Sequence, residues 1–263
     1  MIMDLHLDGK IAVVTGAGRG IGLAITEHLT DAGAHVVAGA RTMSDRIADL
    51  HSEGSVTFVP GDLAGTDAPA ELVAAASRLG GTDILINNAG AVTARPGGFT
   101  TVTDEDWQSS WTLGMMAAVR TTRAAIPEML RRGGGAIVTI GSVNAFFPDP
   151  GVVDYCAVKA ALTNLTKALS KEFGPQGIRA NSISPGPVLT DLWLGNGGIA
   201  ETVAQASGSN AREVADRAVA GTPSGRFTTP DEVADLALFL ASDRAANITG
   251  TDMTIDGGFI TTL

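Results

Sequence analysis

The sequence of 263 residues predicts a single α/β domain built on a doubly wound parallel sheet with helices on both faces. Short runs rich in β-branched residues alternate along the chain with longer segments in which apolar residues recur at helical spacing. Several runs are apolar without alternation, as expected where helices cover both faces of a parallel sheet. The candidate strands are residues 11–16, 35–39, 56–60, 83–87, 136–141, 178–184 and 253–256.

Composition narrows the class of protein and its partners. The chain has 28 acidic and 18 basic residues, and its net charge of -10 would repel a nucleic-acid backbone. No stretch approaches the roughly 20 apolar residues that span a bilayer, and residues 1–10 do not read as a secretion signal. We therefore expect a soluble, cytoplasmic protein without nucleic-acid or membrane partners. The single Cys156 cannot form an intrachain disulfide, and no cluster of Cys and His has metal-site spacing, so no metal is expected.

Residues 1–263 are expected to form one catalytic domain, and one stretch of it breaks the strand and helix rhythm. Residues 187–228 are rich in Gly, Pro and Thr, with a helical pattern at residues 211–219. An insertion late in an α/β chain suits a mobile flap over a site, although an inert surface excursion would have the same composition.

A glycine-rich turn, TGAGRGIG at residues 15–22, follows the first candidate strand and leads into a helical segment. Glycines allow a tight turn and let the backbone approach a pyrophosphate, which the N–H groups of the helix N-terminus then bind. An ordinary βα turn can also be glycine-rich, but the place in the first βα unit favours the dinucleotide site of a Rossmann-type fold. The predicted contacts are Gly16, Arg19, Gly20, Ile21 and Gly22.

The end of the second candidate strand bears on the type of dinucleotide. It reads Gly39, Ala40, Arg41, without the carboxylate that usually binds the adenosine ribose of NAD. Arg41 and Arg19 could instead reach a 2′-phosphate, which favours NADP(H) and leaves NAD(H) possible; both could also be solvated surface charges. After the third strand, Asp62 and Leu63 could contact adenine, although an Asp at this place is often a helix cap.

Together these residues and several later motifs resemble the short-chain dehydrogenase/reductase family in its single-domain form. The resemblance is carried by residues 15–22, NNAG at 87–90, Ser142, Tyr155 with Lys159, and ISPGPVLT at 183–190. It runs from about residue 5 to the C-terminus and includes DGG at 256–258. It implies oxidoreductase activity and further cofactor contacts at Asn88, Ala89, Gly90, Tyr155, Lys159, Pro185, Gly186, Val188 and Thr190.

The spacing of Tyr155 and Lys159 has a chemical reason. Residues four apart share one face of a helix, so the lysine can act on the tyrosine. A phenol with a pKa near 10 must lose ~2 to 3 units to move protons near neutral pH. An ammonium and an oxidised nicotinamide ring supply positive charge for that shift. Ser142 follows a strand, where serine is also a common N-cap; the resemblance implies that its hydroxyl binds the substrate oxygen.

One position departs from the family pattern. Gly114 stands where the family usually has an asparagine that helps to hold a water between the lysine and solvent, which puts the proton relay in question. Glycine could keep a helix irregularity and leave space for another water; nothing in the sequence shows that Asn144 or Asn164 replaces the side chain. The alternative function is therefore a nucleotide-binding sensor or scaffold with weak or lost catalysis. An enoyl reductase fits less well because those relatives usually separate Tyr and Lys by more residues, and an epimerase would need sugar-binding features that are not seen.

Substrate and assembly are weakly encoded. Residues expected near the substrate are Asn144, Phe146, Phe147, Leu192, Trp193 and Leu194, although core packing would also explain the aromatic ones. Together they suggest an apolar pocket with a few polar groups. The family resemblance implies a small-molecule carbonyl or secondary alcohol as the substrate, with 3-oxoacyl compounds among the candidates. Relatives commonly form homotetramers through helices that correspond to residues 104–131 and 152–173, so we expect a homo-oligomer, tetramer or dimer; the same apolar residues could pack on the sheet.

Overall fold

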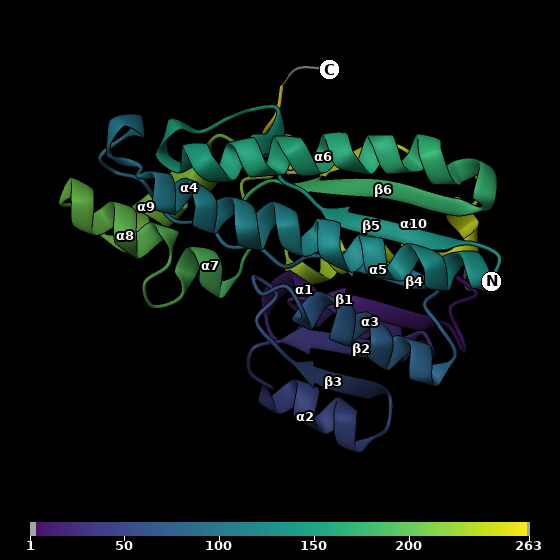
Figure 1. Ribbon diagram of the computed structural model, residues 1–263. Coiled ribbons are helices and arrows are strands. Elements are labelled where there is room, and N and C mark those ends of the chain that lie inside the picture. The colour runs from purple at the N-terminus through teal and green to yellow at the C-terminus, as the bar shows by residue number, and fades with distance from the viewer. Residues whose placement is uncertain (1–3, 262–263) are drawn as a thin grey trace.

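The computed structural model describes residues 4–261 and contains a parallel sheet of seven strands in the order β3-β2-β1-β4-β5-β6-β7 (Figure 1). Its strands are β1 (Ile11–Thr15), β2 (His35–Ala40), β3 (Val56–Pro60), β4 (Ile84–Asn87), β5 (Gly135–Ile140), β6 (Ile178–Pro185) and β7 (Asp252–Ile255). Each agrees with a predicted strand to within about one residue at either end. The doubly wound α/β prediction is confirmed.

Helices cover both faces of this sheet. One face carries α1, α2 and α10 and the other carries α3, α5 and α6 (Figure 1). Alternate residues of β1 supply the two cores, with Ala12 and Val14 in one and Val13 in the other. The helices are α1 (Gly20–Asp31), α2 (Asp45–Ser52), α3 (Ala68–Leu79), α4 (Asp104–Trp111), α5 (Ala117–Arg131), α6 (Val153–Phe173), α7 (Asp191–Leu194), α8 (Ile199–Ser207), α9 (Ala211–Ala220) and α10 (Pro230–Ala241).

The strand order places the site. Because every strand pair is parallel, all the carboxyl ends lie at one edge of the sheet. The order reverses between β1 and β4, so the loops that leave these neighbouring strands diverge. Ligands of open α/β sheets bind at this kind of switch point.

The irregular stretch at 187–228 contains more helix than its composition indicates. The predicted helix at 211–219 is present as α9, but α7 and α8 were not predicted. The prediction missed α8 because glycines dominate the residues just before it, and Gly197 and Gly208 adopt positive φ angles at its two ends. A parallel bridge between Val188 and Thr228 joins the two ends of the stretch. In Figure 1 its helices lie beside α4, to one side of the sheet.

Candidate active site

The glycine turn between β1 and α1 has the shape of an anion cradle. Helix α1 begins at Gly20, and its N-cap residue Arg19 provides no side-chain hydrogen bond to the first turn. A Cβ atom at Gly22 would lie 2.2 Å from the carbonyl oxygen of Gly16, so the turn cannot close with a larger residue there. The backbone therefore stays open to a ligand, and the helix N-terminus favours negative charge. These residues fit the pyrophosphate of a dinucleotide.

Asn88 braces this turn from the neighbouring strand. Its side-chain amide donates to the carbonyl oxygens of Thr15 and Gly16, at 3.0 and 3.2 Å. The backbone N–H groups of Asn88 and Ala89 both donate to the Thr15 hydroxyl, at 2.9 and 3.0 Å. The polar groups of these predicted contact residues are thus largely used inside the protein, and Asn88 shapes the cradle through Thr15 and Gly16.

The residues predicted to contact the adenosine part of the dinucleotide lie along the same edge of the sheet. Arg41 directly follows β2, and both Arg41 and Arg19 are exposed. Neither forms an ion pair within residues 4–261. Asp62 follows β3, and its carboxylate accepts a hydrogen bond of 3.0 Å from the Ala64 backbone. Asp62 therefore holds its own turn and is not a helix cap, since the N-cap residue of α3 is Asp67, while Leu63 beside it is buried.

The end of β6 reaches the same cradle. The Thr190 side chain would be 3.4 Å from a Cβ atom at Gly20, so residues far apart in the sequence meet at the start of α1. Pro185 ends β6, and a Cβ atom at Gly186 would lie 2.8 Å from that of Asp256, so the strand end needs glycine to pass the C-terminal segment. Val188 is buried beside these residues.

The three predicted catalytic side chains come together beside β5. Ser142 follows this strand, and its hydroxyl accepts a hydrogen bond of 3.2 Å from the Asn144 backbone. Tyr155 lies in the first turn of α6 and Lys159 in the next turn. The Lys159 Nζ atom is 5.4 Å from the centre of the Tyr155 ring and donates to the Ile140 carbonyl oxygen at 2.7 Å.

Burial shifts the pKa values of both helix residues toward their neutral forms. Desolvation of the phenol raises the pKa of Tyr155 to about 12, while hydrogen bonding with Ser142 acts in the opposite direction. Desolvation also lowers the pKa of Lys159 to about 8. Lysine is still mostly protonated at neutral pH, but without a bound ligand the tyrosine is far from its working range. Additional positive charge beside Tyr155, such as that of an oxidised nicotinamide ring, would lower this pKa toward the working range.

Gly114 sits in a turn of π-helix, η2 (Thr112–Met116), that joins α4 to α5. The expectation that glycine keeps a local helix irregularity is confirmed. A Cβ atom at Gly114 would lie 2.5 Å from the Cγ1 atom of Val158, the residue before Lys159. Val158 therefore occupies the space of the missing side chain, and the expectation that glycine leaves this space for another water is wrong.

The residues expected near the substrate are spread around this edge. Phe146 and Phe147 are exposed, as are Leu192 and Leu194 of α7. Two edge-to-face pairs, each with ring centres 5.7 Å apart, join Phe147 to Phe259 and Trp193 to Phe227. Residues from three separate loops thus supply apolar surface, whereas Cys156 is buried in the packing of α6.

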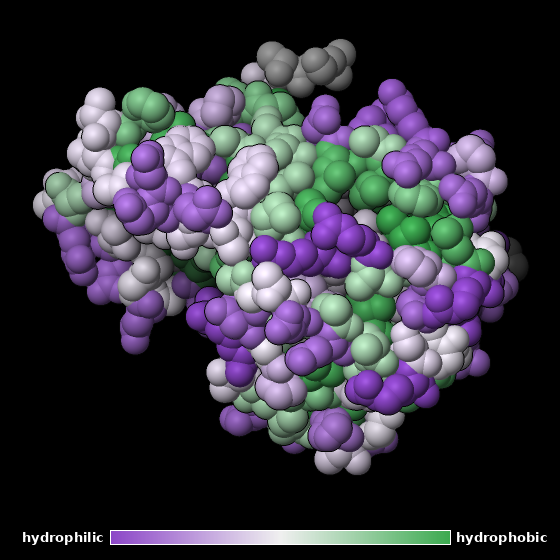
Figure 2. Space-filling model, in the orientation of Figure 1, coloured by the Kyte–Doolittle hydropathy of each residue, from purple (hydrophilic) through white to green (hydrophobic). Residues whose placement is uncertain are grey.

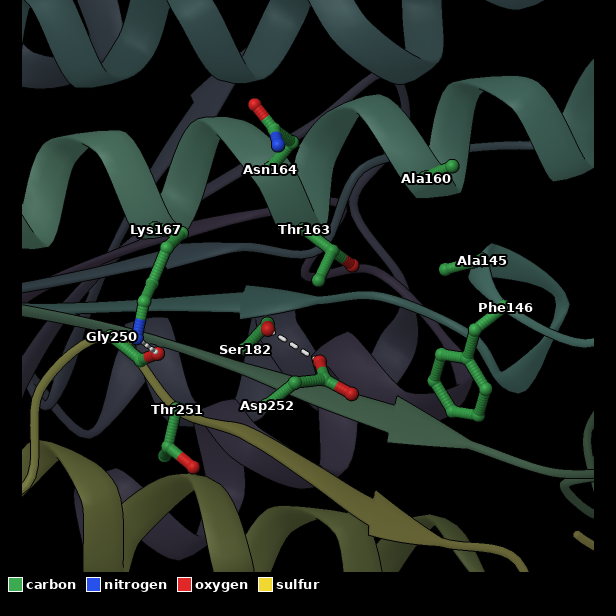
Figure 3. A pocket seen from close by; sticks show the side chains of 10 residues that line it. All are labelled: Ala145, Phe146, Ala160, Thr163, Asn164, Lys167, Ser182, Gly250, Thr251 and Asp252. Atoms are coloured by element: carbon green, nitrogen blue, oxygen red, sulfur yellow. Dashed lines mark hydrogen bonds between the residues drawn. The ribbon is translucent and has the colours of Figure 1, made fainter. Parts of the chain in front are cut away.

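A separate cavity of about 330 Å³ lies between α6, β6 and β7 (Figure 3). None of the three predicted catalytic residues lines it, although Ala145 and Phe146 follow Ser142 in the chain. Its polar groups bind one another: Asp252 accepts from Ser182, and Lys167 donates to the Gly250 carbonyl oxygen at 2.6 Å. Asn164 lines this cavity and not the surroundings of Lys159, so it does not replace a side chain at position 114.

Sequence reasoning missed several residues that shape the site. The Thr15 hydroxyl organises the NNAG segment, and the Ile140 carbonyl oxygen holds Lys159. Arg95 and Asp154 form a buried ion pair beside Tyr155. Thr15 could have been suspected from its place between strand and glycine turn. A backbone carbonyl or a distant ion pair has no local sequence signal. Within the described residues 4–261, no group of His, Cys, Asp or Glu is arranged to hold a metal ion.

Comparison with known proteins identifies the class. A family model described as "Enoyl-(Acyl carrier protein) reductase" matches residues 16–260. D-beta-hydroxybutyrate dehydrogenase of Rhizobium meliloti is 36% identical over 262 residues, which cover 95% of this chain and 98% of that protein. D-threitol dehydrogenase of Mycolicibacterium smegmatis is 36% identical over 267 residues, covering 97% and 95%.

A solved structure is similarly close along its whole length. L-sorbose reductase from Gluconobacter frateurii, determined with NADPH and L-sorbose, superimposes with a TM-score of 0.90 at 36% identity, covering 99% of this chain and 100% of that one. The fold and site define a nicotinamide-dependent oxidoreductase that acts on alcohol and carbonyl groups. The chain belongs to the short-chain dehydrogenase/reductase family. These relatives favour the enzyme over the sensor or scaffold considered from the sequence.

Proposed function

We propose that this enzyme transfers hydride between NADP(H) and a small ketone or secondary alcohol, with Tyr155 as the group that gives or takes the proton. The observation that carries the proposal is the arrangement of Lys159, whose Nζ atom lies over the Tyr155 ring at 5.4 Å from its centre. Ser142 completes the set. A scaffold has no evident need for a desolvated lysine beside its only tyrosine.

Each side chain has a distinct role in the proposed reaction. The cofactor, when bound, supplies or accepts the hydride. Ser142 donates a hydrogen bond to the substrate oxygen and stabilises the negative charge that develops there. Tyr155 donates its hydroxyl proton to that oxygen during reduction and recovers it during oxidation. Lys159 supplies positive charge that lowers the pKa of Tyr155, and the Ile140 carbonyl holds its ammonium in place.

The substrate is proposed to be a small polyol, ketose or hydroxy acid, with 3-oxoacyl compounds as a further candidate. Polyols and ketoses are supported by two similar proteins, L-sorbose reductase and D-threitol dehydrogenase. Hydroxy acids are supported by a third, D-beta-hydroxybutyrate dehydrogenase. Residues 187–228 are proposed to act as a flap over this substrate, because the Val188–Thr228 bridge pins both ends beside the site while the helices between them extend outward.

The test is nicotinamide absorbance with a panel of ketoses, polyols, 3-hydroxy acids and 3-oxoacyl thioesters, offering NADPH and NADH in parallel. Tyr155→Phe is assayed beside the unmodified enzyme. We expect turnover on at least one panel member, and its loss in the variant with the dissociation constant for NADPH within ~2-fold. A fully active Tyr155→Phe enzyme would remove the proposed acid and base role.

Preference for NADP(H) is proposed from Arg41, which is exposed, directly follows β2 and forms no ion pair with an acidic residue among residues 4–261. Arg41→Ala should weaken NADPH by ~10- to 100-fold, since one charge-assisted contact to a phosphate contributes ~1.5 to 3 kcal/mol. NADH binding should change little. Arg46→Ala is a matched control, because Arg46 is an exposed arginine near the same strand end that already pairs with Glu27. Equal losses for both cofactors would exclude Arg41 as the 2′-phosphate contact.

Homo-oligomerisation is proposed through α5 and α6. Figure 2 shows hydrophobic residues gathered where these two helices lie, between charged side chains. Trp111, the last residue of α4, and Leu130, in the last turn of α5, are both exposed. No helix within residues 4–261 is long and apolar enough to cross a membrane. A cytoplasmic location is a further part of the proposal. Light scattering should give a mass of two or four chains, and Leu130→Glu should reduce it.

A further inference from the structure

A buried carboxylate that the proposed reaction does not use lies next to Tyr155. The side chain of Asp154 is only 1% exposed. Its carboxylate receives hydrogen bonds from Arg95 Nη2 at 2.6 Å and from the Ser110 hydroxyl at 2.7 Å. Contact with Arg95 and Ser110 keeps the pKa of Asp154 below its usual value although burial acts the other way. A charge in this position persists only because its partners are fixed.

Arg95 connects three parts of the chain that surround the site. It lies in the loop after β4, the loop that begins with the NNAG segment. Its Nη1 atom donates to Asp106 in the first turn of α4 at 2.8 Å, and its backbone N–H donates to the Gly151 carbonyl oxygen at 2.7 Å. The guanidinium therefore clamps this loop to the starts of both α4 and α6.

The contact between α4 and α6 continues along matching rows of the two helices. Ser110 lies one turn before Gly114, and Asp154 lies one turn before Val158. The first pair meets through a hydrogen bond. The second pair meets by close approach, because a Cβ atom at Gly114 would be 2.5 Å from Val158 Cγ1. Close approach at one turn and a partly buried hydrogen bond at the previous turn fix the two segments against each other.

The first turn of α6 has no side-chain cap at its N-cap position. Its N-cap residue, Val152, provides no side-chain hydrogen bond. Asp154 directly precedes Tyr155, so the carboxylate that binds Arg95 and Ser110 anchors the main chain immediately before the tyrosine.

We infer that Asp154, held by Arg95 and Ser110, is a positioning residue that sets the place of Tyr155 relative to Ser142 and Lys159, with Gly114 allowing the close helix approach that this requires. The inference rests on the proposed role of Tyr155. Asp154 and Arg95 touch no reacting atom. Their effect on turnover arises because misplacing a reacting group by about 1 Å can cost ~100-fold in rate.

The experiment compares Ser110→Ala and Asp154→Asn with Ser110→Thr, which keeps the hydroxyl. Arg132→Met is the matched control, because it breaks the Arg132–Asp83 ion pair of 2.6 Å at the opposite edge of the sheet. Turnover, KM, NADPH affinity and Tm are measured for each protein. We expect kcat to fall by ~10-fold in Ser110→Ala and by ~100-fold in Asp154→Asn. KM and NADPH affinity should stay within ~3-fold, and Ser110→Thr should recover most of the rate.

If Asp154 and Ser110 had a purely structural role, their variants would change stability and not turnover. In that case Ser110→Ala and Asp154→Asn would lower Tm as Arg132→Met does and leave kcat unchanged, which would overturn the inference. If Asp154→Asn does not fold, Ser110→Ala and its Thr rescue still decide the question.

A second readout separates this inference from the proposed function. The chain has one tyrosine, so tyrosinate absorbance during a pH titration reports Tyr155 alone. Ser110→Ala should displace that titration from the wild-type curve, whereas Arg132→Met should superimpose on it. A displaced titration with a fully active Tyr155→Phe enzyme would refute the catalytic role and keep the positioning role. Superimposable curves for Ser110→Ala would refute the positioning role.

Discussion

The contact between Gly114 and Val158 predicts that replacing a helical glycine by alanine destabilises this protein, which is the reverse of the usual effect. In an ordinary helix, Gly→Ala stabilises the protein by about 1 kcal/mol. Here the new Cβ would lie 2.5 Å from Val158 Cγ1. Val158 is only 3% exposed, and a β-branched side chain in a helix has one strongly preferred rotamer, so it cannot turn away. Overpacking of this kind costs ~1 to 3 kcal/mol.

Gly114→Ala should therefore lower the free energy of unfolding by ~1 kcal/mol, the difference between the overpacking cost and the helix gain. Val158→Ala removes the obstructing methyl group. In that background Gly114→Ala should stabilise the protein by up to about 1 kcal/mol. The two effects differ by ~2 kcal/mol, which is a typical coupling for residues in direct contact.

The assay is urea unfolding followed by tryptophan fluorescence for the four proteins of this double-mutant cycle, at one protein concentration because an oligomer's stability depends on it. Gly54→Ala is unsuitable as a control because Gly54 has a positive φ of 83°. Gly174→Ala is suitable, since Gly174 has helical dihedral angles and nothing lies within 4 Å of its Cβ position. A stabilising Gly114→Ala in the wild-type background, or equal effects in both backgrounds, would refute the packing argument.

Three further predictions concern ionisation and the cradle. The native pKa of Lys159 is about 8 and lies below its unfolded value, so the unfolded chain binds more protons between pH 8 and 10.5. Lys159→Met should therefore stabilise the protein by ~1 to 3 kcal/mol at pH 7 in urea unfolding, and this gain should vanish by pH 10.5. The same variant should lose turnover. The native pKa of Tyr155, about 12, lies above its unfolded value, so the stability of the protein should fall from pH 10 to 12. Binding of NADP⁺ should move the tyrosinate titration to lower pH. A titration that NADP⁺ leaves in place would contradict the proposal that positive charge lowers the pKa of Tyr155. Asn88→Ala removes two hydrogen bonds to the glycine turn and should weaken NADPH binding by ~10-fold in fluorescence titration, whereas unchanged affinity would mean that the turn needs no brace.

Most of the fold was predictable because its signals are local. Each strand of the sheet is a short apolar run, and glycine at positions 16, 20 and 22 marks the turn before α1. Once the strand order is given, the right-handed rule for parallel connections fixes the face that each helix covers; the order itself was not predicted from the sequence. The segment at 187–228 was the exception, because α8 is held by packing on α9 and its sequence is flanked by glycines.

The site was predictable only where chemistry and spacing coincide. Tyr155 and Lys159 are brought together by helix geometry alone, so their contact could be predicted from their four-residue spacing. The brace from Asn88 to Thr15 and the link from Arg95 to Asp154 depend on tertiary structure. Charged residues are usually solvated, and nothing around Asp154 in the sequence indicates that its carboxylate is buried.

The packing of Gly114 bears directly on the choice between an enzyme and a scaffold. From the sequence, glycine at the family's asparagine position was the only support for lost catalysis. In the structure, Val158 fills the space that the side chain would need, and one turn earlier a partly buried hydrogen bond joins Ser110 to Asp154. A site that had lost its asparagine without compensation would leave a cavity beside Gly114. The matched rows of α4 and α6 instead indicate an interface that is complete without the asparagine, so Gly114 gives no reason to expect an inactive protein. Gly114→Asn should then fail to improve turnover unless Val158 is also made smaller.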